Sequence, residues 1–263
     1  MTALVAVEIR RALSRRLVRV LILVALLGIV VLALGAFFSS EPDTANAYSV
    51  GDIWAGNEEP GDANTLGQTS GLFVLMGLLG GASFIGAEYK AGTVTTVLTW
   101  EPRRVRVIAA KLLAAGIVAA AAYVLLQALL GAALIPAVTA RGDDAGLDSE
   151  FYRRVGGLLL RGGLVTGGAA VLGGSLAALG RNTTAALGGA LGYLIVVEQI
   201  VRGLRPGWHD WFLVENLFLV LIGRPEEGSD IERSVLGAGV LLACYLAVVS
   251  VAATAAFARR DVT

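Results

Sequence analysis

Charge is scarce in this chain, since Asp, Glu, Lys and Arg make up only 16% of its 263 residues. A soluble domain usually carries about a quarter charged residues. Hydrophobic residues account for 56% of the sequence, and the mean hydropathy is +0.73. This composition excludes an ordinary soluble domain and indicates a protein whose main solvent is lipid. With a net charge of zero, nucleic acid is not an expected partner.

Residues that usually carry enzyme chemistry are also few. The one cysteine, Cys244, excludes an intrachain disulfide, and the one histidine, His209, has no second histidine with which to hold a metal. No Gly-x-x-x-x-Gly-Lys-Ser/Thr segment occurs, so the chain lacks the usual loop for ATP phosphates. We therefore expect no enzyme activity and no cofactor in this chain, and any ATP energy must come from a partner.

Long apolar runs predict an all-α integral membrane protein that forms a single domain over residues 1–263. A membrane-spanning helix needs roughly 20 apolar residues. The sequence predicts six such spans, at about 17–38, 66–87, 107–139, 155–180, 183–202 and 234–258. The first run is longer than the roughly 7–15 apolar residues of a signal peptide, which favours a retained span. Cleavage near Ala33 and Gly35 is the alternative.

The charges are distributed unevenly between the two sides of these spans. One side carries only 4 carboxylates against 13 cations, which are Arg10, Arg11, Arg15, Arg16, Arg19, Lys90, Arg103, Arg104, Arg106, Lys111, Arg181, Arg259 and Arg260. The other side has three longer loops with 16 carboxylates. The positive-inside rule places both termini in the cytoplasm. Together with an Ala-, Gly- and Arg-rich composition, this predicts a multi-pass protein of a bacterial plasma membrane.

An amphipathic helix is predicted over residues 1–16. At helical spacing one face is apolar, while Glu8, Arg11 and Arg15 lie opposite. Such a helix rests in the headgroup layer as an elbow before the first span. It either binds only anionic lipid or also contacts a cytoplasmic partner.

The loop at 88–106 is short, basic and predicted to be cytoplasmic. Gly92 and Thr93 can end one helix and begin another, because glycine tolerates positive φ and threonine caps a helix N-terminus. Pro102 then stops a short apolar face before the basic cluster. We predict a coupling helix whose partner-binding residues are Glu88, Gly92, Thr93, Arg103, Arg104 and Arg106. Alternatively, the arginines only enforce topology.

This region resembles type-2 ABC transporter permeases. The resemblance is carried by Gly86-x-Glu88-Tyr89-Lys90-x-Gly92-Thr93, followed by Leu98-Thr99, Pro102, Arg103, Arg106 and Lys111-Leu112. It implies a permease subunit that pairs with a second copy or a similar permease. It also implies that the loop docks on a separate ATP-binding subunit, which would hold ATP and Mg. The absence of the longer Glu-Ala-Ala loop of importers favours export. The alternative is a stand-alone secondary carrier or a membrane scaffold without an ATPase.

Two charges lie inside apolar runs, Arg161 and Glu198. Ionisable groups at this depth usually face protein or water. Three alternatives remain open for them: they pair with one another, Glu198 pairs with Arg202 and Arg161 snorkels, or both line a transport path. The glycine pairs Gly163/Gly167 and Gly188/Gly192 have the spacing of close helix contacts, either within the chain or between subunits.

The last outer loop, 203–233, contains an apolar stretch at 211–223 that is too short to span a membrane. It predicts a re-entrant or interfacial helix before the sixth span, with Trp208 and Trp211 at headgroup depth. The resemblance implies that this segment is an outer gate, and a simple amphipathic cap is the alternative.

Overall fold

The computed structural model describes residues 1–39, 65–93, 103–141, 149–224 and 233–259, and every regular element in these ranges is helical. Six helical stretches are long and apolar enough to cross a membrane. Five of them are single helices: α2 (Arg16–Ser39), α4 (Thr65–Lys90), α6 (Arg104–Arg141), α7 (Ser149–Gly180) and α11 (Val235–Arg259). The predicted all-α membrane fold and its six spans are confirmed.

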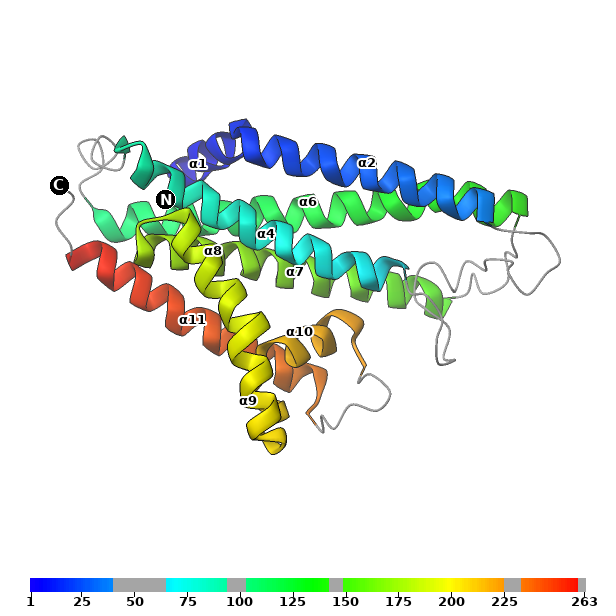
Figure 1. Ribbon diagram of the computed structural model, residues 1–263. Coiled ribbons are helices and arrows are strands. Elements are labelled where there is room, and N and C mark those ends of the chain that lie inside the picture. Colours follow the sequence, from blue (N-terminus) through cyan, green and yellow to red (C-terminus); the bar gives the residue numbers. More distant parts are fainter. Residues whose placement is uncertain (40–64, 94–102, 142–148, 225–232, 260–263) are drawn as a thin grey trace.

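The fifth span is not one uniform helix. It runs through α8 (Thr183–Gly192), a π-helical turn η1 (Tyr193–Val197) and α9 (Glu198–Leu204). Asn182 starts it, because its side chain accepts a hydrogen bond from the Thr184 backbone N–H at 2.8 Å. In Figure 1 this stretch crosses the other helices obliquely, and its far end leaves the bundle.

The remaining helices are short. The chain opens with α1 (Thr2–Ser14), which precedes the first span. A 3₁₀ turn η2 (Pro206–Trp211) and α10 (Leu213–Ile222) lie between the fifth and sixth spans. The predicted short helix within 211–223 is thus confirmed as a ten-residue helix, and it packs on α7 and α11.

Helices α4, α6 and α7 form the centre of the bundle, with α2 along α6 and α11 along α7 (Figure 1). The contact between α4 and α7 is very close. A Cβ added at Gly77 would lie 2.7 Å from the Thr166 carbonyl oxygen, and one at Gly81 would meet the Ala170 backbone. Only glycine lets two helix backbones approach in this way.

The two glycine pairs differ in their surroundings. Gly163 and Gly167 face α6, where a Cβ at Gly167 would lie 2.9 Å from the Gly116 carbonyl oxygen. This pair therefore serves packing within the chain. A Cβ at Gly188 or Gly192 would meet nothing within 4 Å in the described structure.

Helix α1, the end of α4, the start of α6 and the start of α8 all lie at one end of the bundle (Figure 1). We call this the basic end, because it includes Arg10, Arg11, Arg15, Lys90 and Arg103. The end of α4 is shaped by Gly92, whose φ of +67° is a left-handed conformation that glycine adopts without strain. The predicted break at Gly92 is therefore confirmed.

Candidate functional site

Five charged side chains meet inside the basic end. We call them the ion cluster: Glu8 and Arg11 from α1, Arg15 from the corner before α2, Glu88 from α4 and Lys111 from α6. The Lys111 ammonium lies at its centre. It donates to Glu8 Oε2 at 2.9 Å and to Glu88 Oε1 at 2.8 Å. Arg15 reaches Glu88 Oε1 at 3.2 Å, and Arg11 reaches Glu8 Oε1 at 3.0 Å.

The centre of the cluster is almost free of solvent. The side chains of Glu8, Lys111 and Glu88 are only 1%, 5% and 8% exposed. Buried charges persist only when they are paired and hydrogen-bonded, and removing one partner leaves another uncompensated. The ring of Phe84 lies beneath two of the cations, with the Arg15 guanidinium carbon 5.3 Å from its centroid. The cluster therefore ties α1 to the two helices that flank the 88–106 loop.

Glu8 of α1 differs from the expectation. The sequence placed Glu8 on a polar face directed away from the membrane. In the structure Glu8 and Ala12 are the buried residues of α1, whereas Val7 and Leu13 are each 48% exposed. The physical reason is Lys111, whose buried ammonium requires a second carboxylate besides Glu88. Glu8 therefore packs on the protein beside Ala12 and the half-buried Leu4, Val5 and Ile9 of the predicted apolar face, whereas Arg11 of the predicted polar face is exposed.

The predicted docking residues do not share one environment. Glu88 is buried, so its carboxylate holds the ion cluster together instead of facing outward. Arg103 is exposed, while Arg104 and Arg106, at the start of α6, are half-buried. Thr93 is exposed, and residues 94–102, on which the predicted coupling helix depends, lie outside the described residues.

Sequence reasoning did not include Glu8 and Lys111 among the functional residues. Lys111 lies inside the apolar run that predicted the third span. An ionisable residue in such a position is itself a signal for a buried partner. Its partners could not be found by spacing, because Glu8 is 103 residues away along the chain.

Away from the basic end, the two intramembrane charges hold α10. Glu198 Oε1 accepts a hydrogen bond from the Val214 N–H, in the first turn of α10, at 3.0 Å. Arg161 donates from Nη2 to the carbonyl oxygen of Ile222, the last residue of α10, at 3.3 Å. A carboxylate at the N-terminus and a guanidinium at the C-terminus both complement the helix dipole.

Glu198 and Arg161 therefore use backbone groups of α10 as partners. Arg202 forms an ion pair with Glu215 at 2.6 Å, in place of the Glu198 pairing that the sequence suggested. Glu198 is only 1% exposed, and its Oε2 has no partner in the described structure.

The two tryptophans lie just before α10. Trp208 and Trp211 are each 57% exposed, and the Arg233 guanidinium lies 5.2 Å from the Trp211 ring centroid. Tyr245 of α11 donates to the Trp211 carbonyl oxygen at 3.1 Å. This segment is therefore fixed to the sixth span while its indole rings point out of the bundle.

Among the described residues, no group of three or more His, Cys, Asp or Glu side chains is arranged to hold a metal ion. A scan of the sequence against protein-family models gives no match, and a search of curated proteins finds no similar sequence. The two polar sites, the ion cluster and the charges that hold α10, are therefore the candidate functional features of this chain.

Proposed function

We propose that this chain is the membrane subunit of an ATP-driven exporter, moved by a separate ATP-binding subunit. The observation that carries the proposal is the ion cluster. It binds α1 to the last turn of α4 and the first turns of α6, and these helices bracket the 88–106 loop. A force applied to that loop would reach three helices together. Such a rigid connection is what coupling to an external motor requires.

The orientation belongs to the same proposal: the basic end faces the cytoplasm, as the positive-inside rule requires. A cysteine placed at the exposed Lys90, in a Cys244→Ser background, tests it. A membrane-impermeant maleimide should label this cysteine in inside-out vesicles and fail to do so in intact cells. A matched cysteine at the exposed Trp208 should give the opposite pattern. Labelling of Lys90→Cys from outside would reject the orientation.

Docking of the ATPase is tested by charge reversal at Arg103, Arg104 and Arg106. The tagged chain is purified in mild detergent with an ABC-type ATPase from the same organism. Reversal of all three arginines to glutamate should remove the ATPase, because like charges across an interface oppose docking. A matched control reverses three exposed arginines of the other end, Arg153, Arg154 and Arg205. Equal ATPase recovery from both variants would remove the docking role.

A second subunit is part of the proposal, because a half-channel needs a partner to enclose a path. We place this contact on α8, where Gly188 and Gly192 lie one turn apart with open space above them. Small residues at this spacing allow close approach of two helices. In a Cys244→Ser background, cysteine crosslinking at Gly188 should give a dimer, whereas a cysteine at Gly239, on the sixth span, should not.

One observation favours a second function, that of a secondary carrier. Glu198 is buried and has an unpartnered carboxylate oxygen, as an ion-coupling group would. Flux into ATP-free vesicles under an imposed proton or sodium gradient, abolished by Glu198→Gln, would support the carrier. The exporter requires no flux under these conditions.

A further inference from the structure

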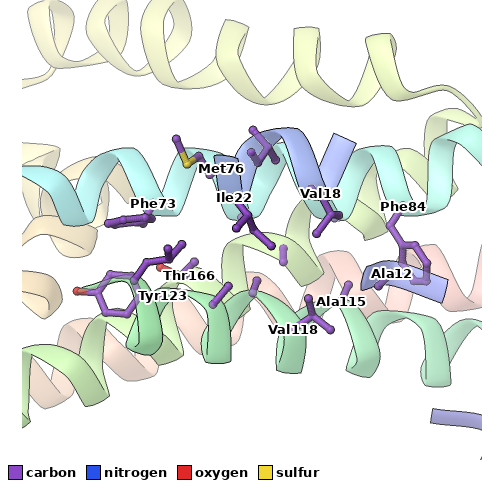
Figure 2. A pocket seen from close by; sticks show the side chains of 18 residues that line it. Ala12, Val18, Ile22, Phe73, Met76, Phe84, Ala115, Val118, Tyr123 and Thr166 are labelled. Atoms are coloured by element: carbon purple, nitrogen blue, oxygen red, sulfur yellow. The ribbon is translucent and has the colours of Figure 1, made fainter. Parts of the chain in front are cut away.

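A cavity lies along the inner side of α2, just below the ion cluster. Figure 2 shows side chains that line it, among them Val18 and Ile22 of α2, Phe73, Met76 and Phe84 of α4, and Val118 of α6. We call this space the α2 groove. Its lining includes several residues with little or no side chain, among them Gly80, Ala115 and Ala119. Because these residues of α4 and α6 are small, a space remains between them and α2.

Water is a poor occupant of this space. The groove has a volume of about 70 Å³, several times the roughly 10–15 Å³ that one water needs. A buried water also needs two to four polar partners. The Tyr123 hydroxyl is already bonded to Ser70 at 2.7 Å. In the described structure, the Thr166 hydroxyl is the one buried side-chain polar atom of the wall left without a partner.

The length of the groove matches one lipid leaflet. It extends along α4 from Phe73 to Phe84, which at a rise of 1.5 Å per residue is about 16 Å. Half of a hydrocarbon core about 30 Å thick is about 15 Å. Val18, Leu21 and Ile22 on the α2 side are only half-buried, and α2 is among the spans least covered by protein. A chain can therefore enter from the side.

The end of the groove near the ion cluster is basic. Arg15 stacks over Phe84, which lines the groove, and its side chain remains 26% exposed. Arg19 is exposed one turn further along α2, on the same face of the helix as Arg15, and its Nη2 donates to the Ser14 carbonyl oxygen at 3.1 Å. An apolar wall with guanidinium groups at one end is complementary to a molecule that has a hydrocarbon chain and an anionic headgroup.

We propose that the α2 groove binds one acyl chain of an anionic phospholipid from the leaflet at the basic end, with its phosphate at Arg15 and Arg19. The apolar wall gives no hydrophobic gain over bulk lipid, so selectivity depends on the fit of the chain and on headgroup charge. This site is independent of the proposed ATPase, since it requires only the described helices. The bound lipid fills a gap that would otherwise leave α2 poorly packed.

Filling the groove tests the proposal. A Cβ at Gly80 would lie 4.0 Å from Leu21 Cδ1, so a larger side chain enters the groove without meeting backbone. Gly80→Phe should occupy the space of the chain. Gly80→Leu is a smaller substitution for the same purpose. Gly28→Phe is the matched control, because a Cβ at Gly28 meets nothing within 4 Å.

The protein is purified from vesicles of phosphatidylglycerol and phosphatidylcholine, and retained lipid is counted by native mass spectrometry. Wild type and Gly28→Phe should keep one phosphatidylglycerol. Gly80→Phe should keep less than about a tenth as much, because an overpacked groove excludes the chain. Circular dichroism and gel filtration verify that each variant is folded.

The headgroup is tested by Arg19→Gln, which should lower the preference for phosphatidylglycerol about fivefold, as expected for one basic residue near an anionic surface. Arg16→Gln, on the adjacent side of the helix, should have a smaller effect. Equal phosphatidylglycerol retention by Gly80→Phe and Gly28→Phe would overturn the site. Equal retention of both lipids by wild type would overturn its anionic selectivity.

Discussion

Replacing Lys111 by methionine removes the central cation of the ion cluster with little change of side-chain length. Glu8 and Glu88 would keep Arg11 and Arg15, which lie nearer to solvent, and would lose the ammonium that both carboxylates share. Removing one partner of a buried ion pair typically costs about 3–5 kcal/mol. Because the two arginines remain, we expect a loss near the lower end, about 3 kcal/mol.

The same reasoning predicts a rescue. When Glu8→Met and Glu88→Met are added to Lys111→Met, the three most deeply buried charges are removed together, and apolar side chains of similar length take their place. Replacement of a buried ionic group by apolar residues of similar volume is often neutral or stabilising. The triple variant should therefore regain most of the lost stability, although each carboxylate substitution alone in wild type is destabilising.

Thermal unfolding in detergent, followed by loss of the monodisperse peak in gel filtration, provides the assay. For a chain of this size about 1 kcal/mol corresponds to roughly 2–4 °C, so Lys111→Met should lower the midpoint by roughly 6–12 °C. Arg10→Gln, an exposed charge on the same helix as Glu8, should change it little. A midpoint for Lys111→Met equal to that of Arg10→Gln would refute the reasoning, as would a triple variant less stable than Lys111→Met.

Three further predictions concern the backbone and α10. Gly81→Ala should cost about 1–3 kcal/mol in unfolding free energy, because its Cβ meets the α7 backbone. Gly28→Ala should be neutral or stabilising. Chemical denaturation of both variants measures this difference. Gly92→Ala should cost about 1–2 kcal/mol because its φ is +67°, and Gly92→Asn should cost less, by the same measurement. Glu198→Gln and Arg161→Met should each lower the free energy of local unfolding of α10 by about 1–3 kcal/mol. The effect is measured as faster proteolysis or hydrogen exchange at 206–222. Unchanged exchange in both variants would contradict the role assigned to these charges.

Hydrophobic patterning was sufficient to predict the membrane-spanning helices and the short helix before the sixth span. Each predicted span agrees with its helix to within a few residues at most ends, because about 20 apolar residues have few alternatives to a spanning helix. The short helix at 213–222 was also predictable, since its apolar run was too short to cross a membrane and too apolar for a loop.

The side-chain partners were not predictable in the same way. The burial of Glu8 depends on Lys111, and nothing within α1 reveals that ammonium. Arg161 and Glu198 were recognised as unusual, yet their partners are backbone groups of α10, which carry no sequence signal. Long-range pairing of this kind requires the packed structure.

The glycine contact between α4 and α7 restricts how this molecule can move. Sliding one of these helices past the other would bring a Cβ against a backbone carbonyl, as the crowding at Gly77 and Gly81 shows. We therefore expect the two helices to move together as one rigid unit. In the proposed exporter, opening must therefore involve the helices beside this pair, which are α2, α8–α9 and α11; their protein cover is the thinnest of the described spans. Labels that report motion are best placed there, with α4 or α7 as the fixed reference.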